Sequence, residues 1–211
     1  GQFERVVVSA FGLREGVLLE RMSHQALAVH PLIAAAEALA GRGSRTRAFG
    51  QKLEQWIAPM FEVQPSVFPK KREEVLRGAA ARLADVGGPL HPDQRIGVMF
   101  DLVLRAPLAA ISHEVRAFLA AAIHHRYTKA QPRHADAYVR LLSDEQQAAA
   151  AALGAALRLG AGLSGRSESL LGAFDISVVD GGLLLRVKQK LVHLEEELAV
   201  VARARLQALR P

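Results

Sequence analysis

Cysteine is absent from the 211 residues, and aromatic residues make up only 5% of them. The missing cysteine excludes disulfide scaffolds, zinc sites built on thiolates and cysteine nucleophiles. The chain also lacks any run of about 18 uncharged apolar residues, and its first residues do not have the basic start and apolar middle of a signal peptide. We therefore expect a soluble, cytoplasmic protein that has no membrane partner.

Charge of one sign is in modest excess, because 27 basic side chains against 21 acidic ones give +6. Such an excess favours polyanionic partners, such as phosphate polymers. Nucleic acid is not expected, since no basic helix interleaved with aromatic residues occurs. Half of the chain is apolar and 23% is charged, which is a globular composition. Its richness in alanine and leucine predicts mostly helix.

Apolar residues recur at helical spacing along most of the chain and predict a mainly α fold. The predicted helices are Leu13–Met22, Leu27–Leu39, Ser44–Phe61, Pro69–Leu83, Pro92–Leu104, Ser112–Tyr127 and Ser143–Leu163. The last of these opens on Ser143-Asp144-Glu145-Gln146, a capping box that indicates where the helix starts.

Short β segments and one further helix complete the pattern. Val6–Val8 predicts the last strand of a sheet whose other strands precede Gly1, unless the C-terminal strands accept it. Phe174–Val178 and Leu183–Val187 flank an Asp-Gly turn and predict a β-hairpin. Val187–Val201 predicts a terminal helix that more often packs on its own domain than on another chain.

Catalytic signatures are missing, since no Walker loop, G-x-S-x-G or H-E-x-x-H motif occurs. The glycine groups at 41–43 and 160–165 do not follow strands, so they are expected to end helices rather than to cradle phosphate. His124 and His125 are adjacent and project about 100° apart from a helix. They cannot chelate as an i, i+4 pair would, and we expect no metal site.

The segment Val8–Leu18, V-S-A-F-G-L-R-E-G-V-L, resembles the G-L-R-E-G signature of the exopolyphosphatase and guanosine pentaphosphate phosphohydrolase (Ppx/GppA) family. In that family the signature joins an actin-like phosphatase module to a helical C-terminal domain. The residues expected at this junction are Gly12, Leu13, Arg14, Glu15 and Gly16. The resemblance implies a remnant of the module at 1–20, a helical domain of the HD type at 21–165, and a hairpin with a terminal helix at 166–211.

Two further segments are similar to HD-type metal-dependent domains. Ala79–Gly87 resembles their A-x-x-L-H-D/E-x-G segment, and Leu157–Leu163 resembles their L-R-L-A-D-x-L segment. Ala84 stands at the position of the metal-binding histidine and Ala161 at that of the closing aspartate, so only Asp85 is left. A scaffold without those ligands cannot hold the HD metal. Asp85 is expected to accept hydrogen bonds at its turn or to pair with an arginine.

The resemblance implies a parent phosphoanhydride hydrolase whose Mg²⁺-dependent site lies between actin-like lobes. This chain alone is then expected to be inactive, without catalytic residues or a cofactor. Its expected partners are polyphosphate or guanosine pentaphosphate, the actin-like domains of its own chain, and a second copy in a homodimer. Candidate polyanion contacts, chosen by charge and location, are Lys70, Lys71, Arg72, Arg95, Arg126, Lys129 and Arg133. The alternative is a stand-alone helical regulatory or interaction module that senses an anionic nucleotide.

Overall fold

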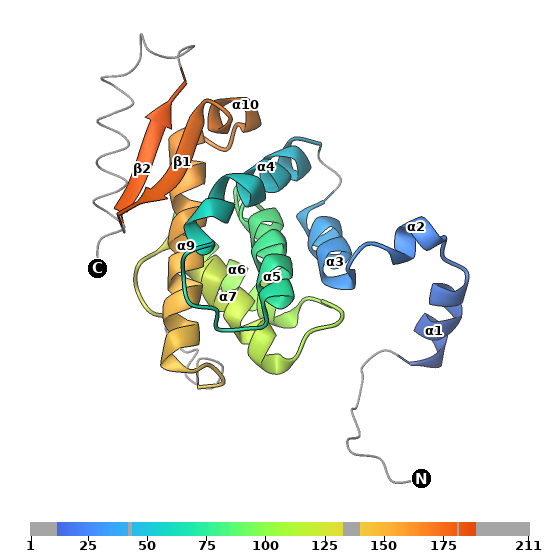
Figure 1. Ribbon diagram of the computed structural model, residues 1–211. Coiled ribbons are helices and arrows are strands. Elements are labelled where there is room, and N and C mark those ends of the chain that lie inside the picture. The colour runs from blue at the N-terminus through green and yellow to red at the C-terminus, as the bar shows by residue number, and fades with distance from the viewer. Residues whose placement is uncertain (1–11, 42–43, 133–139, 181, 189–211) are drawn as a thin grey trace.

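The computed structural model describes residues 12–41, 44–132, 140–180 and 182–188 (Figure 1). Helices dominate these ranges, and strands β1 (Phe174–Val179) and β2 (Gly182–Val187) pair as an antiparallel hairpin. The predicted mainly α fold with a small C-terminal hairpin is therefore confirmed. The predicted strand at Val6–Val8 lies outside the described residues, as does nearly all of the predicted terminal helix.

Five longer helices make up the body of the fold. They are α4 (Ser44–Phe61), α5 (Lys70–Leu83), α6 (Pro92–Arg105), α7 (His113–Tyr127) and α9 (Asp144–Ser164). Each agrees with its predicted range to within one residue at either end. Local chemistry explains this agreement, because the Ser112 hydroxyl accepts a hydrogen bond from the Val115 N–H at 3.3 Å. Ser143 and Gln146 likewise form the reciprocal capping box that starts α9.

Three shorter helices precede this body, and here one prediction is wrong. The segment expected to be a single helix over Leu27–Leu39 is divided between α2 (His24–Leu27) and α3 (Pro31–Ala40), which follow α1 (Leu13–Glu20). The break occurs because Pro31 cannot donate a backbone hydrogen bond and disfavours a helical conformation at the residue before it. His30 caps the new helix, and its Nδ1 accepts a hydrogen bond from the Leu32 N–H at 3.2 Å.

The helices of the body pack closely because small residues lie at their contacts. At Gly154 on α9, an added Cβ would lie 2.5 Å from the Ala122 carbonyl oxygen and 2.5 Å from the Cβ of His125, both on α7. Leu119, Ile123 and Leu157 are fully buried at this contact. The alanine and glycine content of these helices therefore brings α7 and α9 together around one continuous core.

A shared arginine joins α3, α4 and α5. Arg82 lies 2.9 Å from Glu37 and 2.7 Å from Glu54, and only 11% of its side chain is exposed. The hydrogen bond from Arg82 holds the pKa of Glu37 below its ordinary value. These two ion pairs fasten α3 and α4 to the C-terminal end of α5.

The hairpin lies beside α10 (Glu168–Leu171) at one end of the body, whereas α1 and α2 extend from the opposite side (Figure 1). The Trp56 indole N–H donates to the Phe174 carbonyl at 2.9 Å and so attaches β1 to α4. On α1, Leu13 is 87% exposed and Leu18 is 66% exposed. None of the helices within the described ranges combines the length and apolarity needed to cross a bilayer.

Candidate anion-binding cleft

A cleft of about 380 Å³ opens where the C-terminal ends of α5, α7 and α9 come together. A second hollow of about 420 Å³ adjoins it and shares part of its wall. Arginine is the most frequent residue of the cleft wall, which is lined by Asp85, Gly88, Arg95, Arg126, Tyr127, Arg158, Ala161, Gly162 and Arg166. We call this site the arginine cleft.

Arg95 and Arg126 are held in the cleft in different ways. The Arg95 guanidinium donates to the carbonyls of Gly88 at 3.0 Å and Leu90 at 2.6 Å, neutral groups that leave its charge uncompensated. The Arg126 Nε–H is buried and has no hydrogen-bond partner among the described residues. Burial lowers the pKa of Arg126, and the charges of Arg166 and Arg95 lower it further. A negative charge in the cleft would therefore stabilise the charged form of Arg126.

The ring of Tyr127 packs against the guanidinium groups of both arginines. Its ring centroid lies 4.9 Å from the Arg126 guanidinium carbon and 5.6 Å from that of Arg95, which are cation–π distances. Its hydroxyl donates to the Ala84 carbonyl at 3.0 Å. Burial raises the pKa of this hydroxyl, so it stays protonated near neutral pH. Tyr127 thus positions the two guanidinium groups and adds no negative charge.

The opposite side of the cleft is formed where α9 ends. Gly165 and Arg166 have φ angles of 55° and 67°, in the left-handed region. This reversal carries Arg166 back towards Asp85, with 3.3 Å between Nη1 and Oδ1. An added Cβ at Gly88 would lie 2.5 Å from Arg166 Nη1 and 3.0 Å from the Asp85 carbonyl oxygen, so the guanidinium packs closely against this glycine. The expectation that Asp85 pairs with an arginine is confirmed.

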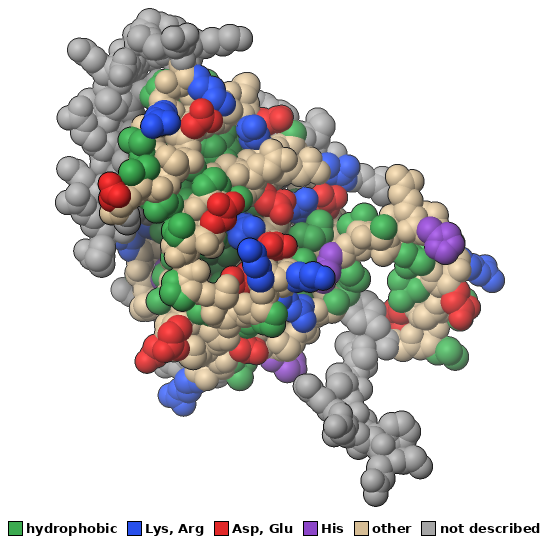
Figure 2. Space-filling view, viewed as in Figure 1, with side chains coloured by type: hydrophobic (Ala, Val, Ile, Leu, Met, Phe, Trp, Pro, Cys, Tyr) green, Lys and Arg blue, Asp and Glu red, His purple; other side chains and the backbone are tan. Residues whose placement is uncertain are grey.

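The charge balance determines what the arginine cleft can bind. Among the described residues, four guanidinium groups share the wall with one carboxylate, that of Asp85. Guanidinium groups bind phosphate oxygens through paired N–H donors and stay charged throughout the physiological pH range. The arrangement therefore suits an anion that carries several negative charges. In contrast, basic and acidic side chains lie interspersed over the face of the molecule seen in Figure 2.

The structure places the predicted polyanion contacts in separate regions. It brings Arg95 and Arg126 together, whereas Lys70, Lys71 and Arg72 lie at the other end of α5, about 20 Å away along the helix. Arg72 donates to the Ala110 carbonyl at 3.0 Å, so it holds a neighbouring loop. Lys129 is exposed just beyond α7, and Arg133 lies outside the described residues. The described candidates do not converge on one site.

Two arginines of the cleft, Arg158 and Arg166, were not predicted from the sequence. Arg158 had a detectable signal, since it is the only charged residue between Glu145 and Arg166. A lone arginine in so apolar a helix must reach a polar group or a cleft. Arg166 had no such signal, because its direction depends on the left-handed backbone after α9.

The five residues of the G-L-R-E-G segment lie at the start of α1. The Glu15 carboxylate accepts a hydrogen bond from the Gly12 N–H at 2.7 Å, which stabilises the first turn of the helix. Among the residues that the structure describes, no three His, Asp or Glu side chains converge as a metal site would require. At the HD-like position, Ala84 and Ala161 offer no ligand atom, and Asp85 is engaged with Arg166.

Comparison with known proteins identifies one family. The family model described as exopolyphosphatase, C-terminal (Ppx_C) matches residues 32–209, which include every residue of the arginine cleft. No curated protein matches the chain.

Proposed function

Because the chain belongs to the family of exopolyphosphatase C-terminal domains, we propose that its arginine cleft binds the phosphate chain of polyphosphate on behalf of a catalytic site elsewhere in the parent enzyme. The observation that carries this proposal is the convergence of Arg95, Arg126, Arg158 and Arg166 on one cleft with a single carboxylate. Polyphosphate carries negative charge on every unit, so each arginine can meet a phosphate oxygen.

The state of Arg126 supports a ligand rather than a purely structural cluster. Its Nε–H is buried without an acceptor in the described part of the chain, and such a donor destabilises the fold by about 1–3 kcal/mol. A phosphate group in the cleft would compensate the positive charge of this guanidinium group. It would also offset the burial of the Arg126 charge, which is the main cause of its lowered pKa, and the smaller repulsion by Arg166 and Arg95.

The wall of the cleft favours inorganic polyphosphate over guanosine pentaphosphate. A purine base is commonly recognised by stacking on an aromatic face. In the part of the chain that the structure describes, Tyr127 is the only aromatic residue in the lining, and guanidinium groups already lie against its ring. The cleft thus offers contacts for phosphate groups and none that would hold a base by stacking. The same reasoning makes a stand-alone sensor of an anionic nucleotide the weaker alternative.

Hydrolysis is assigned in this proposal to another part of the parent enzyme. The Mg²⁺ that the family resemblance implies is expected between the actin-like lobes, and the described residues of this chain bring no three His, Asp or Glu side chains together to hold it here. We therefore propose that this domain binds substrate and does not cleave it. Contacts with the actin-like domains through α1, the formation of a homodimer and a cytoplasmic location remain predictions.

Equilibrium titration of polyphosphate tests the assignment of the cleft. We expect Arg126→Gln and Arg166→Gln each to weaken binding by about tenfold, the effect of losing one charge-assisted hydrogen bond. Arg105→Gln is the matched control, because Arg105 is an exposed arginine on α6 outside the cleft. Circular dichroism verifies that each variant is folded. Equal binding by the three variants would refute the cleft as the site.

Three further measurements separate the parts of the proposal. Binding should fall steeply with added salt, as it does for other polyanions held by arginine and lysine. Guanosine pentaphosphate should compete no better than inorganic pentaphosphate. Phosphate release should be undetectable with Mg²⁺ or Mn²⁺ added, and metal-dependent turnover by this chain would contradict the non-catalytic role.

A further inference from the structure

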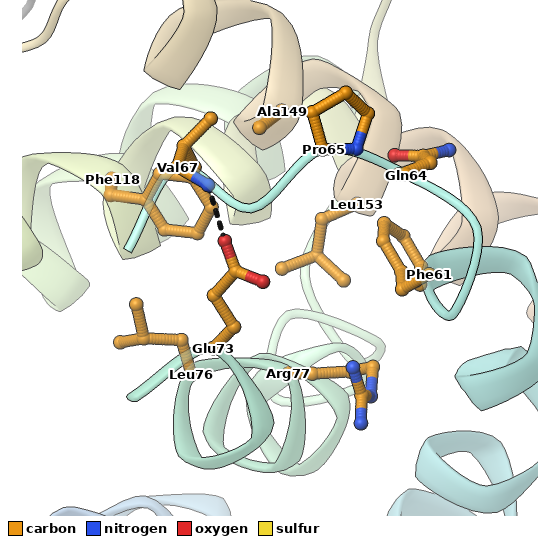
Figure 3. Close-up of a pocket in the computed structure, with 10 residues that line it drawn as sticks. All are labelled: Phe61, Gln64, Pro65, Val67, Glu73, Leu76, Arg77, Phe118, Ala149 and Leu153. Atoms are coloured by element: carbon orange, nitrogen blue, oxygen red, sulfur yellow. Dashed lines mark hydrogen bonds between the residues drawn. The ribbon is translucent and has the colours of Figure 1, made fainter. Parts of the chain in front are cut away.

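A second pocket lies at the opposite end of the three helices that form the arginine cleft. It sits between the early turns of α5, α7 and α9 and the loop that follows α4 (Figure 3). Most of its lining is apolar, and the ten residues are Phe61, Gln64, Pro65, Val67, Glu73, Leu76, Arg77, Phe118, Ala149 and Leu153. Two charged residues, Glu73 and Arg77, also line the pocket.

Glu73 has one oxygen engaged and one directed into the pocket. Its Oε1 accepts hydrogen bonds from the backbone N–H groups of Val67 at 2.6 Å and Phe68 at 3.0 Å, which fix the loop over the pocket. The other oxygen, Oε2, points towards the interior (Figure 3). The carboxylate is therefore held in place while half of its hydrogen-bonding capacity faces the pocket.

Arg77 lies one turn later on the same face of α5. It forms no ion pair with Glu73 or with any other carboxylate in the described ranges. Its Nε is buried and lacks a hydrogen-bond partner among the described residues. Residues at i and i+4 on a helix are neighbours and commonly pair when their charges are opposite. Here the two side chains do not pair with each other, and both residues line the apolar pocket.

We propose that this pocket binds a free α-amino acid with a small aliphatic side chain. The ammonium group would meet the Oε2 of Glu73, and the carboxylate would meet the guanidinium of Arg77. The side chain would lie among Phe61, Phe118 and Leu153. A zwitterion complements both charges at once, whereas a simple carboxylate would face Glu73 and a simple amine would face Arg77.

The size of the pocket limits the side chain. It offers about 40 Å³ to the centre of a water-sized sphere, and one water molecule requires about 10–15 Å³ by the same measure. A space of this size accommodates about three or four heavy atoms. An isopropyl or isobutyl group has this size, and an aromatic ring does not. Valine and leucine are accordingly the expected ligands, and phenylalanine is not.

Titration of the 211-residue chain with L-valine, followed by ligand-observed NMR and calorimetry, tests the proposal. For a ligand of about eight heavy atoms we expect a Kd on the order of a millimolar. Isovalerate and isobutylamine keep the valine skeleton and lack the ammonium or the carboxylate, respectively. Each should bind about tenfold more weakly than valine, as should N-acetyl-valine amide, which lacks both charges.

Variants locate the ligand in the pocket. Arg77→Gln and Glu73→Gln should each weaken valine binding by about tenfold. In Glu73→Gln the glutamine side-chain oxygen can still accept the hydrogen bonds from the Val67 and Phe68 N–H groups, so the loop stays in place. Lys71→Gln and Glu74→Gln are matched controls, because both residues are exposed on α5 outside the pocket. Unchanged binding in the two pocket variants would overturn the proposal. So would isovalerate or the uncharged amide binding as tightly as valine, or no valine binding at about 10 mM.

Discussion

Asp85 and Arg166 are 81 residues apart in the chain and meet at the mouth of the arginine cleft, with 3.3 Å between Oδ1 and Nη1. The Arg166 side chain is 46% exposed, so solvent screens the pair and it stabilises the fold by less than about 1 kcal/mol. Its main effect is on the charge inside the cleft. Asp85 neutralises one guanidinium group, and an incoming anion must compete with it.

Asp85→Asn should therefore tighten polyphosphate binding several-fold at low salt, because it removes the one carboxylate that the described residues bring to the cleft and leaves Arg166 for the ligand. Calorimetric titration measures this change. The control is Asp93→Asn, which makes the same change in net charge at an exposed residue outside the cleft. An equal gain in both variants would mean that net charge, rather than the cleft, controls binding.

Gly154→Ala should destabilise the protein by about 1–3 kcal/mol, because the new methyl group would force apart the backbones of α7 and α9. Gly97→Ala is the contrasting variant on α6. Its Cβ would meet nothing within 4 Å, so it should stabilise the helix by about 0.5–1 kcal/mol. Urea unfolding measures both effects. Changes of the same sign would contradict the packing described for Gly154.

Arg82→Gln should lower the free energy of unfolding by about 2–3 kcal/mol, since it leaves Glu37 and Glu54 without their shared cation in a largely buried setting. A double-mutant cycle with Glu54→Gln isolates the interaction. Arg105→Gln is the control, because the exposed pair of Arg105 with Asp101 should contribute within about 0.5 kcal/mol. A similar loss in both variants would exclude the special role of Arg82.

Stability should fall as the pH drops below 6.5. Burial lowers the pKa of His124 and of His125, so both imidazoles stay neutral in the folded protein where unfolded histidine already binds a proton. Urea unfolding at pH about 7.5 and about 5.5 measures the difference. His125→Gln should reduce this pH dependence, and replacement of His113, an exposed residue on the same helix, should not. An unchanged slope in His125→Gln would contradict the effect of burial.

Most helix boundaries could be predicted from the sequence because they are set by adjacent residues. Ser112 and Ser143 cap helices whose start needs no distant contact, and Pro92 begins α6 in the same local way. The one wrong helix, over Leu27–Leu39, has the same basis. Apolar spacing continues through Pro31 and therefore predicts one helix. The local signals for the break between α2 and α3 are Pro31 itself and the cap formed by His30.

The arginine cleft could be predicted only in part. Arg95 and Arg126 were candidates because of their charge, but charge alone also selected Lys70 and Lys71 at the far end of α5. The grouping depends on how α5, α7 and α9 pack, and that packing rests on contacts between residues distant in the chain. Arg158 and Arg166 join the site for the same reason.

The shared direction of α5, α7 and α9 has a consequence for selectivity among anions. All three helices end at the arginine cleft, and each C-terminus carries about half a negative charge from its unpaired carbonyl groups. Together they offset part of the guanidinium charge before any ligand arrives. A monovalent ion such as chloride would gain little against this background, whereas a chain of linked phosphates contacts several arginines at once. If the cleft binds polyphosphate as proposed, this arrangement would favour polyvalent anions over small monovalent ones.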